Sequence, residues 1–557
     1  MSVFSHNRRQ RWVAAIAASS LAFLVAACGE GSGVAGNKMA TVPGPGEPIY
    51  TMIIDAGSSG TRINFYKVVA GSYPKIDLLS SQDFEDNGIN DFLNGTGTID
   101  PPEWKSKPEK KKDTGLDDGY APAGCSMTGD TKNGGQAEVG PCVIQPLLDA
   151  MKKTMDKEGV TSDKITVELF ATAGMRTMEK FNGGSFTSEQ IASFYDTMKK
   201  YTRSKGFVTG DFRTSNGNKE EGVWTWVNLN DQYYNAFGGN TTYHTTAPET
   251  RGDFEVGGSS MQVAFPTTTI PVGDANNVYP VSINGKTYNV FSKTYLGLGG
   301  DDTRKFVRAY GYSNAATAGY TGVDCFGSNA SLGKGTEEDS GITLFNAPKL
   351  FPNSAAPAGN ATGVSWPTIL SNSGAGTPLV LGATGRYNFE TCAAKYNEVT
   401  QAVMALPRNN NGTSYEGSAS SYSDLATKIA QSSVPFVGLD NFYYTTNDLK
   451  LVTKGKIKTA ITEAQVKTAI ATICPDNGKG PAAKDSNEPT LRDFGVCPNA
   501  AYMYNFLWRD TTGTGGLFDP SSKAKYDGVV PSKIEVDGKN VSVLTWSRGY
   551  LLLKYSK

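Results

Sequence analysis

Two short segments of the chain place an acidic residue directly before a turn rich in glycine and serine. The first reads DAGSSGTR over residues 55–62, between two apolar runs, and the second reads EVGGSS over residues 255–260. Glycine allows close approach of the backbone to a ligand, and successive turn N–H groups form an anion-binding concavity. A carboxylate at the strand end, such as Asp55, can hold Mg²⁺ or Ca²⁺ through water. A surface hairpin without function is the alternative for either segment alone.

Two further segments carry groups suited to phosphate chemistry. Thr172 to Arg176 follows an apolar run at 165–171 and combines small residues with a base, although a plain strand-to-helix turn also fits. Glu221 precedes the aromatic stretch GVWTW. A carboxylate partly desolvated by such neighbours can act as a general base toward water, and the alternative is a solvated acid at a helix start.

Histidine is nearly absent from this chain, which restricts its chemistry. The two histidines are His6 and His244, and no CxxC motif occurs. A zinc site with two histidines in the mature chain is therefore excluded, and a Ser or Cys triad would depend on His244 alone. We expect the chemistry to use carboxylates, hydroxyls and a hard metal ion.

Periodicity indicates an α/β protein. Apolar runs flank the first turn as in a β-hairpin, and strand–turn–strand is expected again over 254–265. Helical spacing occurs over 143–157 and 188–204, with a strand over 165–171 between them. The polar or Gly/Ser/Asn-rich stretches 85–142, 310–385 and 408–424 are expected to be insertions. The two similar turns suggest two related lobes that share one cleft.

The N-terminus has the features of an export signal. Arg8, Arg9 and Arg11 precede an apolar run that ends in VAAC at Cys28, which resembles the lipobox of bacterial lipoproteins. The resemblance implies a signal peptide over 1–27, a lipid on Cys28 and, with Gly29 next, an outer-membrane location with the catalytic domain extracytoplasmic. A plain secretory signal is the alternative. Residues 28–45 are Gly/Pro-rich and are expected to form a flexible tether.

Composition agrees with an exported globular protein. The formal net charge is −1 over 557 residues, which disfavours nucleic acid as a partner. Six cysteines remain besides Cys28, an even number that suggests three disulfides. Pairing of sequence neighbours (125–142, 325–392, 474–497) is the simplest of fifteen possibilities.

Taken together, these segments resemble the five characteristic regions of the nucleoside triphosphate diphosphohydrolases, or apyrases. The counterparts occur in the family's order at 55–62, 171–176, 220–230, 255–262 and 436–445. The resemblance implies an α/β fold of two actin-like, RNase H-like lobes with the active site in the cleft between them. Lobe I would contain 46–213 and 530–557, and lobe II would contain 214–529.

The resemblance also implies roles for individual residues. Glu221 would be the base, with Ser260 and Gln262 positioning the attacking water. The phosphates would be held by Ser58, Ser59, Gly60, Thr61, Arg62, Thr172, Ala173, Gly257, Gly258 and Ser259. Mg²⁺ or Ca²⁺ would be held through water by Asp55, Thr172, Glu255 and Trp546. The nucleobase of the substrate would stack on rings drawn from Phe442, Tyr443, Tyr444 and Tyr502.

The implied activity is removal of the γ- and then the β-phosphate of nucleotides such as ATP and ADP by a monomeric enzyme. One departure concerns the fourth region, where the family's usual aspartate and alanine are replaced by Glu255 and Ser259. This change affects the expected metal preference and rate more than the reaction class. Two alternatives remain: an exopolyphosphatase-like phosphohydrolase, and a surface lipoprotein that binds nucleotides but has lost activity.

Overall fold

The computed structural model describes residues 46–58, 60–84, 88–93, 97–98, 125, 133–182, 184–238, 249–268, 275–304, 306–307, 325, 331–332, 379–380, 387–404, 422–453, 458–474, 491–508, 516–518, 524–531, 533–536, 539–543 and 546–556. The predicted signal and tether, Cys28, Ser59 and most of the three predicted insertions lie outside these ranges. Within them, no helix has the length and apolar character needed to cross a membrane.

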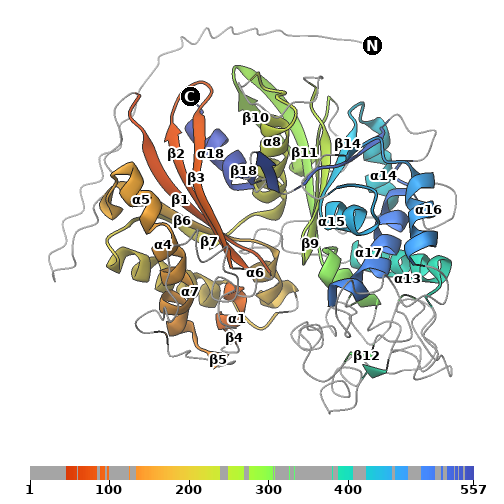
Figure 1. The fold of residues 1–557 in the computed structure, drawn as a ribbon, viewed down its shortest axis with the longest axis horizontal. Helices are drawn as coiled ribbons and strands as arrows, with labels where there is room; N and C mark the ends of the chain where they lie inside the picture. Colours follow the sequence, from red (N-terminus) through yellow and green to blue (C-terminus); the bar gives the residue numbers. More distant parts are fainter. Residues whose placement is uncertain are drawn as a thin grey trace, which may run out of the picture. The chain divides into compact units, whose positions relative to one another are not determined.

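A first mixed sheet has the strand order β3-β2-β1-β6-β7 (Figure 1). Its strands are β1 (Ile49–Ala56), β2 (Thr61–Val69), β3 (Lys75–Phe84), β6 (Ile165–Ala171) and β7 (Val208–Thr214). The first three strands are antiparallel neighbours, whereas β6 pairs parallel to β1 and β7 pairs parallel to β6. The predicted hairpin is confirmed, with Ala56 opposite Thr61 across the turn.

Helices cover one face of this sheet because their apolar stripes match its buried residues. The predicted helix over 143–157 is present in pieces, and the helix over 188–204 is confirmed, with a capping box at Thr187. The helical segments of this region are α1 (Ile89–Leu93), η1 (Gln136–Glu138), η2 (Gly140–Ile144), α4 (Gln145–Ala150), α5 (Lys152–Glu158), η3 (Ser162–Lys164), α6 (Ala173–Met178), η4 (Lys180–Asn182) and α7 (Ser188–Ser204).

A second mixed sheet has the order β10-β11-β9-β8-β14-β16-β15. Its strands are β8 (Gly252–Val256), β9 (Ser260–Pro266), β10 (Val278–Ile283), β11 (Lys286–Leu296), β14 (Phe436–Asp440), β15 (Lys458–Thr459) and β16 (Tyr526–Val529). The predicted strand–turn–strand over 254–265 is confirmed as β8 and β9.

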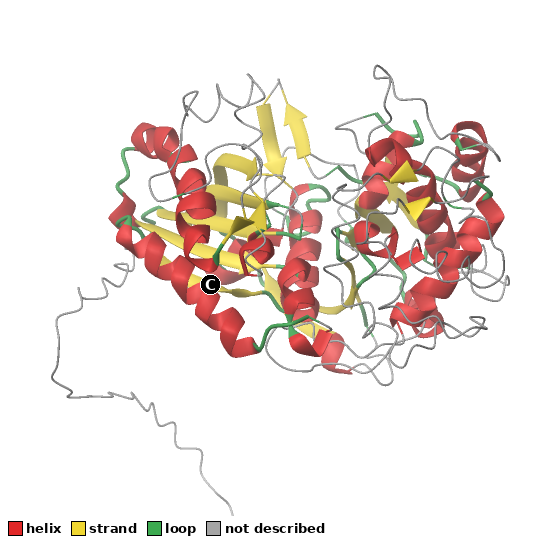
Figure 2. Cartoon of the chain, turned by 90° about the horizontal axis from the view of Figure 1, so that it is seen from below, coloured by secondary structure: helices red, strands yellow, loops and turns green. Residues whose placement is uncertain are grey.

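One hydrophobic core joins this second sheet to its own helices. These helices are α13 (Phe389–Met404), α14 (Tyr422–Gln431), α15 (Asn441–Asp448), α16 (Glu463–Ile473) and α17 (Leu491–Trp508). Figure 1 labels them to the right of β9 and β11, and Figure 2 shows how helices flank the strands of the chain. Short elements complete the described chain: η6 (Ala275–Asn277) and the two-stranded pairs β4 (Gly97–Thr98) with β5 (Asn133–Gly134), β12 (Ser331–Leu332) with β13 (Leu379–Val380), and β17 (Lys533–Val536) with β18 (Lys539–Val543).

Two helices connect the sheets. They are α8 (Val223–Gln232), which follows the π-helical segment η5 (Gly217–Gly222), and α18 (Trp546–Tyr555). A separate core cluster contains residues of both sheets together with Trp224 and Trp226 of α8 and Trp546 of α18. Asp231 of α8 accepts hydrogen bonds from Arg548 of α18 at 2.8 and 3.1 Å, both side chains being buried. The first and second sheets are thus joined through a packed helix pair.

The three disulfides join sequence neighbours, as predicted: Cys125–Cys142, Cys325–Cys392 and Cys474–Cys497. Two of them close segments around the second core, where Cys392, Cys474 and Cys497 are buried. Such cross-links limit the freedom of the unfolded chain and thereby stabilise the fold.

Candidate active site

The two Gly/Ser turns have the same internal geometry. In the first turn, between β1 and β2, the Gly57 N–H donates to the Gly60 carbonyl at 2.8 Å. In the second turn, between β8 and β9, the Gly257 N–H donates to the Ser260 carbonyl at 3.0 Å. Each turn therefore follows a strand whose next-to-last residue is an acid, Asp55 or Glu255, and presents a small-residue loop at the corresponding edge of its sheet.

The second turn is fixed from behind by hydrogen bonds to its carbonyls. The Gly257 carbonyl accepts from the Gly300 N–H at 2.9 Å and from Asn441 Nδ2 at 2.9 Å, and the Gly258 carbonyl accepts from the Asp301 and Asp302 N–H groups at 3.1 Å. In a trans peptide the C=O of one residue and the N–H of the next point in opposite directions. The amides of Gly258 and Ser259 are therefore aimed away from this support, as an anion-binding turn requires.

The two turns approach each other closely at Gly258, where an added side chain would require its neighbours to move. A Cβ placed on Gly258 would lie 2.6 Å from Ser58 Oγ and 3.0 Å from Asp301 Oδ2. A Cβ placed on Gly174, in the first turn of α6, would lie 2.6 Å from Ser58 Cα. The first, second and fourth predicted regions thus meet around Ser58, and Thr172 at the N-terminus of α6 is anchored by its N–H to the Ala56 carbonyl at 3.0 Å.

Glu221, the predicted base, is buried at the edge of this junction. Its Oε2 lies 2.6 Å from Nη2 of Arg176, whose side chain is fully buried. The same nitrogen lies 3.4 Å from Ser260 Oγ, which accepts a hydrogen bond from Gln262 Nε2 at 2.8 Å. The structure therefore brings together Glu221, Ser260 and Gln262, the three residues assigned to activate and position water.

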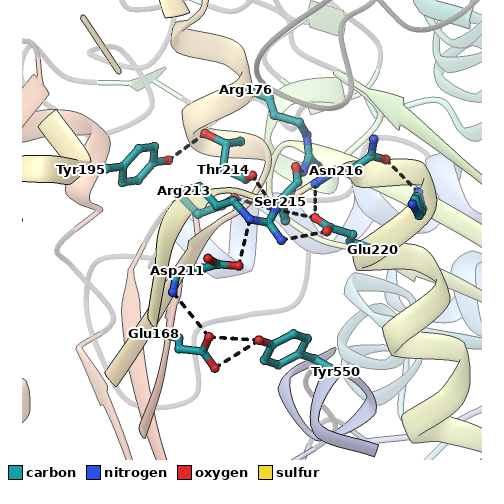
Figure 3. Close-up of polar contacts among 12 residues, drawn as sticks. Glu168, Arg176, Tyr195, Asp211, Arg213, Thr214, Ser215, Asn216, Glu220 and Tyr550 are labelled. Atoms are coloured by element: carbon teal, nitrogen blue, oxygen red, sulfur yellow. Dashed lines mark hydrogen bonds and ion pairs between the residues drawn. The ribbon is translucent and has the colours of Figure 1, made fainter. Parts of the chain in front are cut away.

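A network of polar contacts holds the segment that carries Glu221 (Figure 3). Arg213 at the end of β7 donates to both carboxylate oxygens of Glu220, at 2.7 and 2.8 Å, and Glu220 also accepts from the Asn216 N–H at 2.8 Å. Arg176 Nη1 donates to the carbonyl of Ser215 at 3.2 Å. These bonds tie η5 to β7 and α6, and they fix the position of the next residue, Glu221.

Several carboxyl groups crowd the site and disfavour one another's ionisation. Burial raises the pKa of Asp55 to about 7, with Glu221 adding to the rise while Arg62 opposes it. Burial also raises the pKa of Glu255 well above its ordinary value, and the charges of Glu221 and Asp440 add to that rise. Arg62 bonds to Asp83 and lies 3.9 Å from Asp55. Negative charge therefore exceeds positive charge here, a condition that a bound cation relieves.

The residues assigned to a hydrated Mg²⁺ or Ca²⁺ fit that role. Trp546 Nε1 is buried with no direct hydrogen bond among the described residues, and its N–H favours the charged form of Asp55. Thr225 Oγ1 donates a hydrogen bond to Glu255 Oε2 at 3.2 Å. No cluster of three or more His, Cys, Asp or Glu side chains suited to direct metal ligation occurs in the described part of the chain. The polar groups present are thus compatible with an ion that is held through water.

The aromatic residues assigned to base stacking divide into two sets. Phe442, Tyr443 and Tyr502 are 1–2% exposed and pack in the core of the second sheet, with the Tyr502 hydroxyl bonded to the Leu298 carbonyl. These three rings are packed in the core, which makes them less accessible to a nucleobase than the fourth. Tyr444 is 40% exposed and is the one of the four whose ring is open to a ligand.

Three residues of this region were not singled out by the sequence analysis. Arg176 is a basic residue shortly after a predicted strand in the sequence, and in the structure its side chain joins Glu221 to Ser260. Asp301 lies against Gly258 and is bonded to Arg304 at 2.9 Å. Asp440 ends β14 with a positive φ of 54°. Each of these features depends on contacts or backbone geometry in the folded structure, which the sequence pattern does not reveal.

Each of the two sheets carries a Gly/Ser turn preceded by an acid, and the two turns meet at one site. This arrangement is that of an actin-like phosphohydrolase with its site between two lobes. The chain belongs to the GDA1/CD39 (nucleoside phosphatase) family, whose model matches residues 136–510. It is therefore a nucleoside phosphatase, and the family predicted from the five regions is confirmed.

Individual relatives agree with this assignment. The chain is 24% identical over 516 residues to ectonucleoside triphosphate diphosphohydrolase 2 of Mus musculus, covering 90% of this chain and 81% of that protein. It is 24% identical over 274 residues to guanosine-diphosphatase of Saccharomyces cerevisiae, covering 48% of this chain and 42% of the relative. The solved structure of a nucleoside triphosphate hydrolase from Neospora caninum has the same fold, with TM-score 0.51, 16% identity and coverage of 91% and 92% of the two chains.

Proposed function

We propose that this protein hydrolyses the terminal phosphates of nucleoside tri- and diphosphates, with Glu221 as the base that activates water. One observation supports the proposal above all. Ser58 of the first turn lies against Gly258 of the second, and Ser260 at the end of the second turn is linked through Arg176 to Glu221. Relatives that carry the names triphosphate diphosphohydrolase and guanosine-diphosphatase support the same substrate class.

In this proposal the two turns hold the terminal phosphates and the second lobe holds the water. The amides of Gly258 and Ser259, the hydroxyls of Ser58 and Thr61 and the N-terminus of α6 at Thr172 and Ala173 donate to phosphate oxygens. Ser260 and Gln262 orient a water, and Glu221 takes its proton as the oxygen approaches phosphorus in line with the leaving oxygen. Arg176 fixes the carboxylate of Glu221 in position through the 2.6 Å contact.

The cation, Mg²⁺ or Ca²⁺, would neutralise phosphate charge when bound. Asp55, Glu255, Thr172 and the Trp546 N–H would orient its water shell, and Tyr444 would stack on the nucleobase. Stacking discriminates little among bases, so several nucleotides are expected as substrates.

We further propose that the protein is exported and held at the membrane by a lipid on Cys28, with the catalytic lobes outside the cytoplasm as a monomer. The VAAC sequence at the end of the N-terminal apolar run supports this. Retention of a labelled fatty acid by the wild type and its loss in Cys28→Ser would test the anchor.

The activity is tested by phosphate release from ATP, ADP, GTP and UTP, each with Mg²⁺, Ca²⁺ or chelator. We expect phosphate to be released from both tri- and diphosphates, and we expect this release to stop when chelator is added. Nucleotide binding without turnover in either metal would support the alternative of an inactive binding protein, for which the Glu255 substitution is the motive.

A further inference from the structure

Asp440 has an unusual backbone conformation at the boundary of β14 and α15. Its φ of 54° and ψ of −117° lie outside the regions that residues with a side chain normally occupy. Such conformations persist where the surrounding structure holds them, and they concentrate at ligand sites. Asp440 also precedes a helix without capping it, because its side chain makes no cap hydrogen bond.

The surrounding structure fixes Asp440 at the same sheet edge as the second turn. β14 pairs parallel to β8 with Asp440 beside Val256, the residue before Gly257. The next residue, Asn441, donates from Nδ2 to the carbonyls of Val256 and Gly257 at 2.8 and 2.9 Å. The backbone of Asp440 is therefore held directly beside the turn assigned to phosphate.

The charge of Asp440 acts on both lobes. It favours the charged form of Arg62 in the first sheet and disfavours ionisation of Asp55 and Glu255. The charge of Asp301 in turn disfavours ionisation of Asp440 and so helps to raise its pKa. Among the described residues, the Asp440 carboxylate makes no hydrogen bond, whereas Asp301 is paired with Arg304.

Asp440 also directly precedes the helix that carries the exposed ring assigned to the nucleobase. Tyr444 is four residues further along, about one turn into α15, which begins at Asn441. A nucleotide with its phosphates at Gly257–Ser259 and its base on Tyr444 would place its sugar past Asp440. A linear polyphosphate in the same position would place another charged phosphate there.

We propose that Asp440 is a specificity-determining residue that makes the site select phosphate chains ending in a sugar over linear polyphosphate. This inference rests on the proposed function and concerns the part of the substrate beyond the hydrolysed phosphates. An ionised carboxylate accepts hydrogen bonds from hydroxyl groups and repels phosphate oxyanions. The same side chain therefore favours one class of substrate and penalises the other.

Asp440→Asn is the sharpest test, because asparagine has nearly the shape of aspartate and removes only the charge. Asp448→Asn removes the same charge from the other end of α15 and is the matched control. kcat and KM for ATP and for tripolyphosphate are measured at equal free Mg²⁺ for the wild type and both variants. Binding of tripolyphosphate is measured by calorimetry on the same proteins.

The expected result for Asp440→Asn is a rise of about ten-fold in the ratio of kcat/KM for tripolyphosphate to that for ATP, mainly through a lower KM and tighter binding of tripolyphosphate. Asp448→Asn should leave the ratio at its wild-type value. A ratio within two-fold of wild type in a folded Asp440→Asn that still hydrolyses ATP would overturn the inference. Asp440→Gly, which also accepts this φ, repeats the test if the asparagine variant is unstable. Absence of ATP hydrolysis in the wild type would instead refute the proposed function.

Discussion

The two Gly/Ser turns share a backbone design but differ in charge. In the first turn Asp55 faces Arg62 across the hairpin at 3.9 Å, and Arg62 is bonded in addition to Asp83. In the second turn Glu255 is one methylene longer than the aspartate of the first, and the charges of Glu221, Asp440 and Asp253 add to the rise in its pKa that burial causes. A neighbouring arginine thus opposes the pKa rise of the first acid, whereas neighbouring acids add to the pKa rise of the second.

We expect this difference to make the second turn depend more strongly on a cation, although the acids of both turns orient its water shell in the proposal. A buried group of acids is stable in its ionised form only when a positive charge offsets it. Asp253 illustrates the effect of burial, since it is fully buried with neither oxygen hydrogen-bonded among the described residues, and burial raises its pKa. Substitutions at the two turns therefore test the comparison.

The largest effect is expected from Arg176→Ala, which removes the cation that joins the lobes. The variant leaves Glu221 buried without its partner, and loss of one member of a buried pair costs about 3–5 kcal/mol. Urea unfolding and kcat should both be strongly affected. Arg213→Ala, which breaks the half-exposed pair with Glu220, is the control and should cost about 1 kcal/mol or less. Equal stability losses in the two variants would contradict the buried role of Arg176.

Removing either strand-end acid should separate metal use from phosphate binding. Asp55→Asn and Glu255→Gln each remove one group that orients the water shell, and such changes usually cost about 10–100-fold in metal affinity or activity. We expect the Mg²⁺ and Ca²⁺ activation constants to rise in both variants, with Glu255→Asp changing mainly the ratio of the two metals. Metal titrations of phosphate release and of thermal stability measure this. Unchanged activation constants in Asp55→Asn would contradict the assignment.

The contact between the turns is tested by a pair of glycine variants. In Gly258→Ala the new Cβ would meet Ser58 Oγ at 2.6 Å, whereas in Gly257→Ala it would meet only the Ser260 carbonyl at 3.6 Å, an ordinary contact. Displacement of one turn from the other misaligns the phosphate, so kcat/KM should fall about ten-fold or more in Gly258→Ala. Gly257→Ala should remain within about two- to three-fold of wild type. Equal loss in both variants would show that the contact is not what matters.

The smallest effect concerns pH and the metal-free protein. Asp55 binds its proton more tightly in the folded state, since its pKa rises from 3.8 to about 7. The stability it contributes is therefore complete below pH 3.8 and is lost as the pH rises through 7. In chelator, Tm should fall by a few degrees, about 2–4 °C, between pH 5.5 and 8, and Ca²⁺ or Mg²⁺ should raise Tm more at pH 8. If Tm in chelator did not change with pH, the claim that ionised Asp55 destabilises the metal-free protein would be contradicted.

Local patterns of the sequence predicted much of the fold. The strand–turn–strand segments, the helix over 188–204 and the neighbour pairing of cysteines follow from periodicity and spacing, which are local properties. The order of the five regions also placed Glu221, Ser260 and Gln262 together. The boundaries given for the two lobes stay a prediction.

Tertiary contacts account for what the sequence did not reveal. Successive residues of a helix point about 100° apart, so the consecutive rings of Phe442, Tyr443 and Tyr444 cannot all face one ligand, and packing against the core selects Tyr444. The pairing of Arg176 with Glu221 spans 45 residues and has no local signature. The positive φ of Asp440 likewise has no local signature, and it occurs next to a residue whose side chain bonds to the neighbouring strand.

The most direct test of the central claim is Glu221→Gln, which preserves the size of the side chain and removes its ability to accept a proton. Phosphate release from ATP is measured alongside binding of a non-hydrolysable ATP analogue, with Mg²⁺ present and folding checked by thermal unfolding. The account predicts a fall in kcat of about 10²–10⁴-fold with analogue affinity within a few-fold of wild type. Turnover at the wild-type rate in a folded Glu221→Gln protein would contradict it.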